Sequence, residues 1–203
     1  ELIKVLFENI EGKVGIVRPT FEEYPNRLKP EQIVTYQAKC PDFSYSADDL
    51  MTYFADKDIQ SLLLINPDNP TGNYIPYADC LRLADWCQQR NILFVLDESF
   101  IDFSVEHPTF FKDDILEQYS NLVVIKSISK SYGVPSLRLG ILATSNVDIM
   151  TVIRRSVSIW NINSFAEFFL QILGKYEASY QQAMDEFRAE RARFVDELHK
   201  IGF

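Results

Sequence analysis

Short apolar runs, rich in β-branched residues, recur along the chain and predict its strands. The run at 122–125 contains no polar residue, which is typical of a strand buried on both faces of a parallel sheet. Stretches with apolar residues at helical spacing separate the runs. The pattern predicts strands at 14–17, 32–36, 61–65, 91–96, 122–126 and 139–144, and helices at 1–10, 46–55, 76–90, 112–119 and 147–158. This alternation predicts an α/β fold: a three-layer α/β/α domain around a mostly parallel sheet.

The last part of the chain follows a different pattern. From Ser164 to His199 the apolar spacing is helical for 36 residues, with an interruption predicted at Gly174. A helix of this length usually leaves the domain in which it starts. We therefore predict one domain over residues 1–163 and a long helix over residues 164–203. The chain begins within a helical pattern and without Met, and we expect it to belong to a longer protein.

Composition narrows the function classes. The net charge of −9, without a basic cluster beyond Arg154 and Arg155, argues against a nucleic-acid partner or an anionic membrane surface. No run reaches the roughly 18 apolar residues of a membrane span, and no signal-peptide pattern is present. Cys40, Cys80 and Cys87 are odd in number and lack the spacing of metal ligands. These features favour a reducing compartment, and we expect the cytoplasm.

Chemically active side chains follow three of the predicted strands. Asn69, Asp97 and Lys130 come after the strands at 61–65, 91–96 and 122–126 and are separated by 28 and 33 residues. Each interval is about the length of a strand, a crossover helix and the next strand in a parallel sheet. Ligands bind at the carboxyl ends of such strands. The spacing therefore predicts that an amide, a carboxylate and an amine meet at one edge of the sheet, although a lone Asp after a strand is often only a turn residue.

The order and spacing of these residues resemble the pyridoxal-phosphate enzymes of fold type I, most closely the class I/II aminotransferases of the histidinol-phosphate aminotransferase kind. The resemblance runs through nearly the whole chain. The matching segments are Glu-Leu-Ile at 1–3, Pro-Thr-Phe at 19–21, Asn-Pro-Thr-Gly at 69–72, Asp-Glu-Ser-Phe-Ile-Asp-Phe at 97–103, Ser-Ile-Ser-Lys at 127–130, Arg-Leu-Gly at 138–140 and Trp-Asn-Ile-Asn at 160–163.

The resemblance implies pyridoxal 5'-phosphate as cofactor and gives each matching residue a role. Lys130 matches the lysine that forms the Schiff base and moves a proton at the substrate Cα. Asp97 matches the carboxylate that pairs with the pyridine nitrogen and keeps it protonated. Asn69 matches the amide that donates to the phenolic oxygen of the cofactor.

Four further residues match family positions that bind the phosphate or the ring of the cofactor. Arg138 and Ser127 match phosphate ligands, since a guanidinium offers two donors in a fixed fork and a hydroxyl adds a third. Ser129 is a further candidate for this cup. Phe21 falls where the family stacks an aromatic ring on the pyridine, although a plain core position would explain it equally well.

Phe100 departs from the usual pattern. The family commonly has Tyr here, whose hydroxyl donates to the phenolic oxygen alongside Asn69. Without that donor we expect the pKa of the Schiff base to rise. Phe at this position also resembles the threonine-phosphate decarboxylase branch of the family.

Three functions follow as alternatives. The first is amino transfer between an amino acid or phosphorylated amino compound and a 2-oxo acid, in a homodimer. The second is decarboxylation of a phosphorylated amino acid with the same cofactor. The third is a non-catalytic module of a larger protein. The resemblance also implies that residues 1–163 are the cofactor-binding large domain without its glycine-containing phosphate turn, and that residues 164–203 lead towards a small domain.

Overall fold

The computed structural model describes residues 1–106 and 108–203, and six strands of this described chain form one sheet. The strand order is β2-β1-β3-β4-β5-β6, and every neighbouring pair is parallel except β5 and β6. The strands are β1 (Val14–Arg18), β2 (Ile33–Gln37), β3 (Ser61–Ile65), β4 (Leu93–Asp97), β5 (Leu122–Ser127) and β6 (Gly140–Ala143). The predicted mostly parallel sheet is confirmed.

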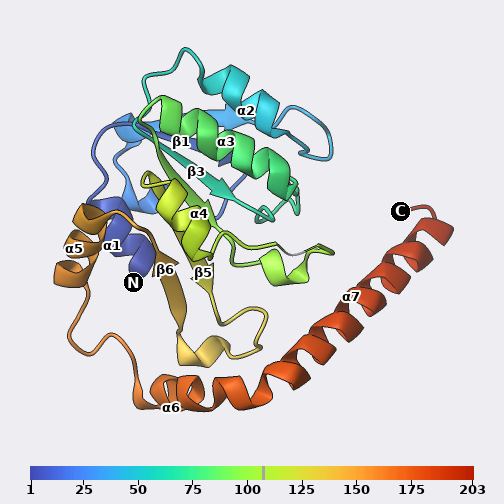
Figure 1. Cartoon of the computed structure of the whole chain (residues 1–203). Coiled ribbons are helices and arrows are strands. Elements are labelled where there is room, and N and C mark those ends of the chain that lie inside the picture. The colour runs from blue at the N-terminus through green and yellow to red at the C-terminus, as the bar shows by residue number, and fades with distance from the viewer. Residues whose placement is uncertain (107) are drawn as a thin grey trace.

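Helices cover both faces of the sheet, which makes the three predicted layers (Figure 1). One core packs α2 (Ala47–Phe54), α3 (Tyr77–Gln89) and α4 (Asp113–Gln118) against the sheet. A second core lies under α1 (Leu2–Glu8) and α5 (Val147–Ser156). Leu62 and Leu64 of β3 belong to the first core, whereas Leu63 and Ile65 belong to the second. This alternation explains why the strand is apolar throughout, because both of its faces are buried.

Side-chain caps fix the start of two helices. Ser46 accepts a hydrogen bond from the amide of Asp49, and the Asp49 carboxylate accepts one from the amide of Ser46. Asn146 accepts hydrogen bonds from the amides of Asp148 and Ile149 at the start of α5. Such caps satisfy amide groups that have no partner within the helix. Both helices therefore begin where the sequence predicts.

The C-terminal arm, residues 164–203, leads away from the sheet (Figure 1). It consists of α6 (Ser164–Leu173), a 3-10 turn over Gly174–Tyr176 and α7 (Glu177–Lys200), so the interruption predicted at Gly174 is present. Within these helices Ala166 and Met184 are buried, while Phe165 is 80% exposed. None of the described helices combines the length and apolar character needed to span a lipid bilayer.

Candidate active site

The loops after β3, β4 and β5 begin side by side at the carboxyl end of the sheet. The register pairs Ile65 with Asp97 and Asp97 with Ile125. Two further backbone hydrogen bonds extend these ladders: the amide of Asn66 donates to the carbonyl of Asp97 at 2.9 Å, and the amide of Glu98 donates to the carbonyl of Ile125 at 2.8 Å. The three predicted groups therefore start from one edge, as expected for parallel strands.

Asp97 is a buried carboxylate whose hydrogen-bond donors are neutral. It is 5% exposed, and the amide of Ser99 donates to its Oδ1 at 2.8 Å. The hydroxyl of the fully buried Tyr24 donates a short hydrogen bond to Oδ2. Burial raises the pKa of Asp97, although the hydrogen bonds from Ser99 and Tyr24 and the positive charge of Lys130 oppose that rise. A buried carboxylate of this kind is a favourable partner for a cation.

Lys130 lies in the turn after β5, on the side of Asp97. Its positive charge lowers the pKa of that carboxylate. Its Nζ stands 5.7 Å from the centroid of the Phe100 ring. Phe100 is the half-buried residue that begins the 3-10 turn Ile101–Phe103. The amine and the buried carboxylate thus follow the ends of two neighbouring strands.

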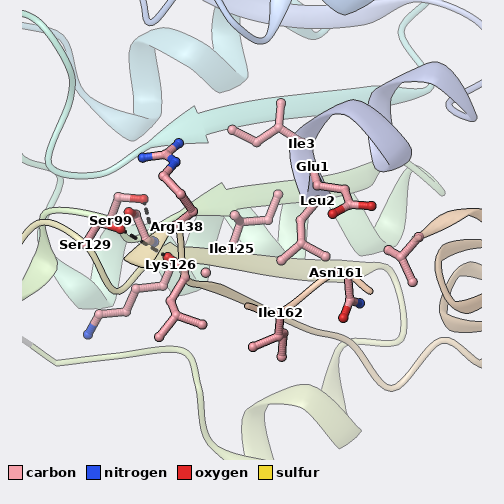
Figure 2. A pocket seen from close by; sticks show the side chains of 14 residues that line it. Glu1, Leu2, Ile3, Ser99, Ile125, Lys126, Ser129, Arg138, Asn161 and Ile162 are labelled. Carbon is pink, nitrogen blue, oxygen red and sulfur yellow. Dashed lines mark hydrogen bonds between the residues drawn. The ribbon is translucent and has the colours of Figure 1, made fainter. Parts of the chain in front are cut away.

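A cavity of about 240 Å³ lies beside these groups, between the carboxyl end of β5 and the start of α1 (Figure 2). Arg138, Ser99 and Ser129 are at one end of it in Figure 2, with Asn161 and Ile162 at the other. The lining residues are Glu1, Leu2, Ile3, Ser99, Ile125, Lys126, Ser127, Ser129, Arg138, Leu139, Gly140, Val157, Asn161 and Ile162. The predicted phosphate ligands Arg138, Ser127 and Ser129 therefore share one cavity.

Arg138 brings an uncompensated positive charge to this cavity. Its backbone is left-handed (φ 58°, ψ 40°), and its Nη1 donates to the carbonyl of Pro135 at 3.2 Å. In the described part of the chain no carboxylate pairs with it. A guanidinium with free donors beside serine hydroxyls suits a phosphate group. The cavity can hold an anion.

Asn69 and Phe21 lie at the same edge of the sheet but not in this cavity. Asn69 is half-buried in the loop after β3. Phe21 is 43% exposed in the loop after β1, and its ring centroid is 6.2 Å from that of Tyr24. The structure leaves their roles as predictions, along with those of the other site residues.

Two residues at the site were missed by sequence reasoning. Tyr24 donates to Asp97, and the hydroxyl of Ser99 accepts a hydrogen bond from the amide of Ser127 at 2.9 Å. Both lie within or beside segments that the resemblance had already marked: Tyr24 follows Phe21 by three residues, and Ser99 follows Asp97 by two. A search of those segments for polar side chains would have found them.

Comparison with known proteins places the whole chain in one family. The sequence model of the aminotransferase class I and II family matches residues 1–203. The chain is 34% identical over 198 residues to CMP-5'-(3-aminopropyl)phosphonate synthase of Streptomyces rubellomurinus, covering 98% of this chain and 31% of that protein. It is 33% identical over 189 residues to threonine-phosphate decarboxylase of Salmonella typhimurium, covering 92% and 51%.

A solved structure agrees with this placement. The histidinol-phosphate aminotransferase from Clostridium acetobutylicum superposes with a TM-score of 0.82 at 26% identity, covering 100% of this chain and 60% of that one. The chain thus spans about a third to three fifths of the length of these relatives.

Proposed function

The chain belongs to the class I and II aminotransferases, and we propose that it carries the cofactor site of an enzyme that transfers an amino group between an amino acid, or a phosphorylated amino compound, and a 2-oxo acid. Enzymes of this family depend on pyridoxal 5'-phosphate. The amino donor and the 2-oxo acid are small molecules, as is typical of the substrates of this family.

The side chains at the carboxyl end of the sheet fit this cofactor. Arg138, Ser127 and Ser129 offer the positive charge and hydroxyls that a phosphate requires. Asp97 offers a buried negative charge to a protonated ring nitrogen. Lys130 offers the primary amine that an aldehyde requires. The phosphate, the ring nitrogen and the aldehyde of pyridoxal phosphate therefore each have a suitable partner among these side chains.

When bound, the cofactor withdraws electrons from the substrate Cα through its protonated ring. Asp97 would hold the proton on the ring nitrogen, and Tyr24 would keep the carboxylate oriented towards it. Asn69 would donate to the phenolic oxygen, and Phe21 would cover the ring. Lys130 Nζ would take a proton from the substrate Cα and return one at the end of the reaction.

The proposal is carried by one observation: the guanidinium of Arg138 shares a serine-lined cavity with Ser99, whose amide donates to the buried carboxylate of Asp97. The test is to incubate the full protein with pyridoxal phosphate, reduce it with borohydride and map the modified residue by mass spectrometry. We expect the label on Lys130, and no label in Lys130→Ala. A protein that stays colourless and unlabelled would instead be a non-catalytic module of the family.

Decarboxylation of a phosphorylated amino acid is the second candidate. It is supported by Phe100, which places an apolar ring rather than a hydroxyl beside the Lys130 amine, and by the similarity to a threonine-phosphate decarboxylase. In that reaction Lys130 would return a proton to the Cα from which the carboxylate has left. Release of carbon dioxide without a 2-oxo acid would support this candidate, whereas amino transfer that depends on a 2-oxo acid would support the first.

We also propose a homodimer in the cytoplasm. Support for the dimer comes from apolar side chains next to the cavity: Trp160 is 90% exposed and Phe165 is 80% exposed, and Asn161 between them lines the cavity. Apolar patches of this kind usually mark interfaces. Light scattering on the full protein would test this, and we expect twice the mass of one chain.

A further inference from the structure

The carboxylate of Asp102 joins two segments on either side of the candidate site. Its Oδ1 accepts a hydrogen bond from Lys126 Nζ at 2.6 Å, and its Oδ2 accepts one from Ser131 Oγ at 2.6 Å. The side chains of Lys126 and Asp102 are only 13% and 17% exposed. Burial raises the pKa of Asp102, but the hydrogen bonds from Lys126 and Ser131, the positive charge of Lys126 and the nearby Tyr180 hydroxyl together lower it, so the carboxylate is ionised at neutral pH.

The contacts of Asp102 involve residues on both sides of Lys130 in the sequence. Ser131 is the next residue in the chain, so its hydrogen bond to Asp102 restrains the backbone that carries Lys130. Asp102 lies in the 3-10 turn that begins at Phe100, and the Phe100 ring is the group that Lys130 Nζ approaches at 5.7 Å. The turn that begins at Phe100 therefore contacts both Ser131, the residue after Lys130, and the end of the Lys130 side chain.

The same turn is tied to α7. Arg188 Nη1 donates to the carbonyl of Asp102 at 2.8 Å, and Arg191 Nη1 donates to the carbonyl of Phe103. The rings of Phe103 and Phe187 meet with their centroids 5.2 Å apart. Arg188 is well enclosed, with its side chain 12% exposed. A displacement of α7 would therefore reach Asp102 directly.

A second contact joins α7 to the lysine turn itself. Tyr132, two residues after Lys130, stacks on Tyr180 of α7 with the ring centroids 3.9 Å apart and the planes at 9°. Burial raises the pKa of the Tyr180 hydroxyl, and the negative charge of Asp102 raises it further. The turn after β5, the turn after β4 and α7 thus meet around Asp102.

We propose that Asp102 is a positioning residue. Through Ser131 it fixes the position of the Lys130 amine, and through its contacts with α7 it makes that position depend on the position of α7. The inference rests on the proposed function, because the amine matters only if it reacts with the cofactor. Asp102 touches neither Lys130 Nζ nor Asp97 in any contact described above. The effect of its hydrogen bond with Ser131 on the cofactor should therefore depend on the presence of Lys130.

The first experiment measures the affinity of the full protein for pyridoxal phosphate in two backgrounds. We expect Ser131→Ala to weaken binding about fivefold to tenfold, as for the loss of one hydrogen bond to a charged group. In the Lys130→Ala background, where Asp97 and Arg138 still bind the cofactor, the same change should have an effect of less than about twofold. Ser131→Thr, which keeps the hydroxyl, should restore the affinity.

The second experiment tests the connection to α7 without the cofactor. Hydrogen exchange of the amides at 128–133 should speed up in Arg188→Gln, because the turn carrying Asp102 loses its tie to the helix. Arg193→Gln is the matched control: Arg193 lies on the same helix, exposed, and pairs with Glu190. It should leave these amides unchanged.

The outcomes separate cleanly. Equal effects of Ser131→Ala with and without Lys130 would mean that the hydroxyl acts on the fold as a whole, which overturns the positioning role. Unchanged exchange in Arg188→Gln would overturn the part played by α7. If the wild-type protein binds pyridoxal phosphate but Lys130 is never labelled, the proposed function fails, and this inference fails with it.

Discussion

The carboxyl end and the amino end of the sheet differ in the kind of side chain that is buried there. Among the described residues, eight polar or charged side chains are buried, and seven of them lie at or beyond the carboxyl ends of β3, β4 and β5. The seven are Asn66, Asp68, Asp97, Glu98, Ser99, Ser104 and Ser129; the eighth, Ser61, is at the amino end. The amino end instead has a mainly apolar cavity of about 310 Å³ between α1 and α5.

From this difference we infer that the carboxyl end of the sheet serves function and the amino end serves stability. Burying polar groups is unfavourable unless each finds partners, and ionised groups are the most unfavourable of all. The carboxyl end accumulates such groups because the proposed chemistry requires them, whereas the amino end has no such demand. Changes at the carboxyl end should therefore reduce function and in some cases raise stability, while changes at the amino end should alter stability alone.

The largest expected effect is at Lys130. In Lys130→Ala the turnover of the full enzyme should fall by on the order of 10²–10⁴-fold, because the group that moves the proton is gone. The free energy of unfolding should change by less than about 0.5 kcal/mol, since Lys130 is exposed. Steady-state assays and urea unfolding would check both values. Lys39→Ala, at an exposed lysine on the loop after β2, should change neither; a similar loss of turnover there would refute the assignment.

Glu98 should make stability depend on pH. Burial raises its pKa to about 7, although Thr109 and the amide of Phe110 donate hydrogen bonds to it. The folded protein then holds a proton that the unfolded chain releases, so stability should fall as pH rises from about 4.5 to 7, by on the order of 3 kcal/mol. Glu98→Gln should remove most of this fall. Urea unfolding at pH 5 and pH 8 would measure it, and an unchanged slope in the variant would contradict the assignment.

At Asp97 the requirements of function and of stability should conflict within one residue. Because burial raises its pKa, ionisation disfavours the cofactor-free fold above the ordinary pKa of 3.8. Asp97→Asn should therefore stabilise the cofactor-free protein at pH 8, and this gain should disappear at low pH. Affinity for pyridoxal phosphate should fall by about tenfold or more, since a charged partner is lost. Asp56→Asn, at an exposed site, should change neither quantity.

Local rules made the start of two helices and the common edge of the candidate site predictable. Ser46 and Asn146 cap their helices as the sequence indicates, because a cap depends on residues two or three positions away. The spacing of Asn69, Asp97 and Lys130 predicts their common edge, because parallel strands need crossovers of similar length. The fold and the family could thus be predicted from the sequence.

Contacts between distant segments could not be predicted from the sequence. The hydrogen bond from Tyr24 to Asp97 spans 73 positions, and the one from Ser131 to Asp102 spans 29. They depend on how the loops leave the sheet, which no local pattern encodes. The antiparallel direction of β6 is similar: a strand at 139–144 was predicted, but its orientation follows from the connection over 128–139, whose described residues form a 3-10 turn and no crossover helix.

The smallest expected effect tests the amino end. Val5 on α1 lines the 310 Å³ cavity and is 6% exposed. Val5→Ile adds one methylene to this space, and burying it should stabilise the fold by about 0.5–1 kcal/mol. Neither turnover nor cofactor affinity should change, because the carboxyl end is untouched.

The same substitution at a closed site supplies the contrast. Val95 is fully buried at the centre of β4, and Val95→Ile should destabilise the fold by about 1–3 kcal/mol because the extra methylene must displace its neighbours. Urea unfolding of the two variants should therefore give changes of opposite sign. If Val5→Ile is as destabilising as Val95→Ile, the cavity has no room for a methylene, and the amino end of the sheet is as tightly packed as its centre.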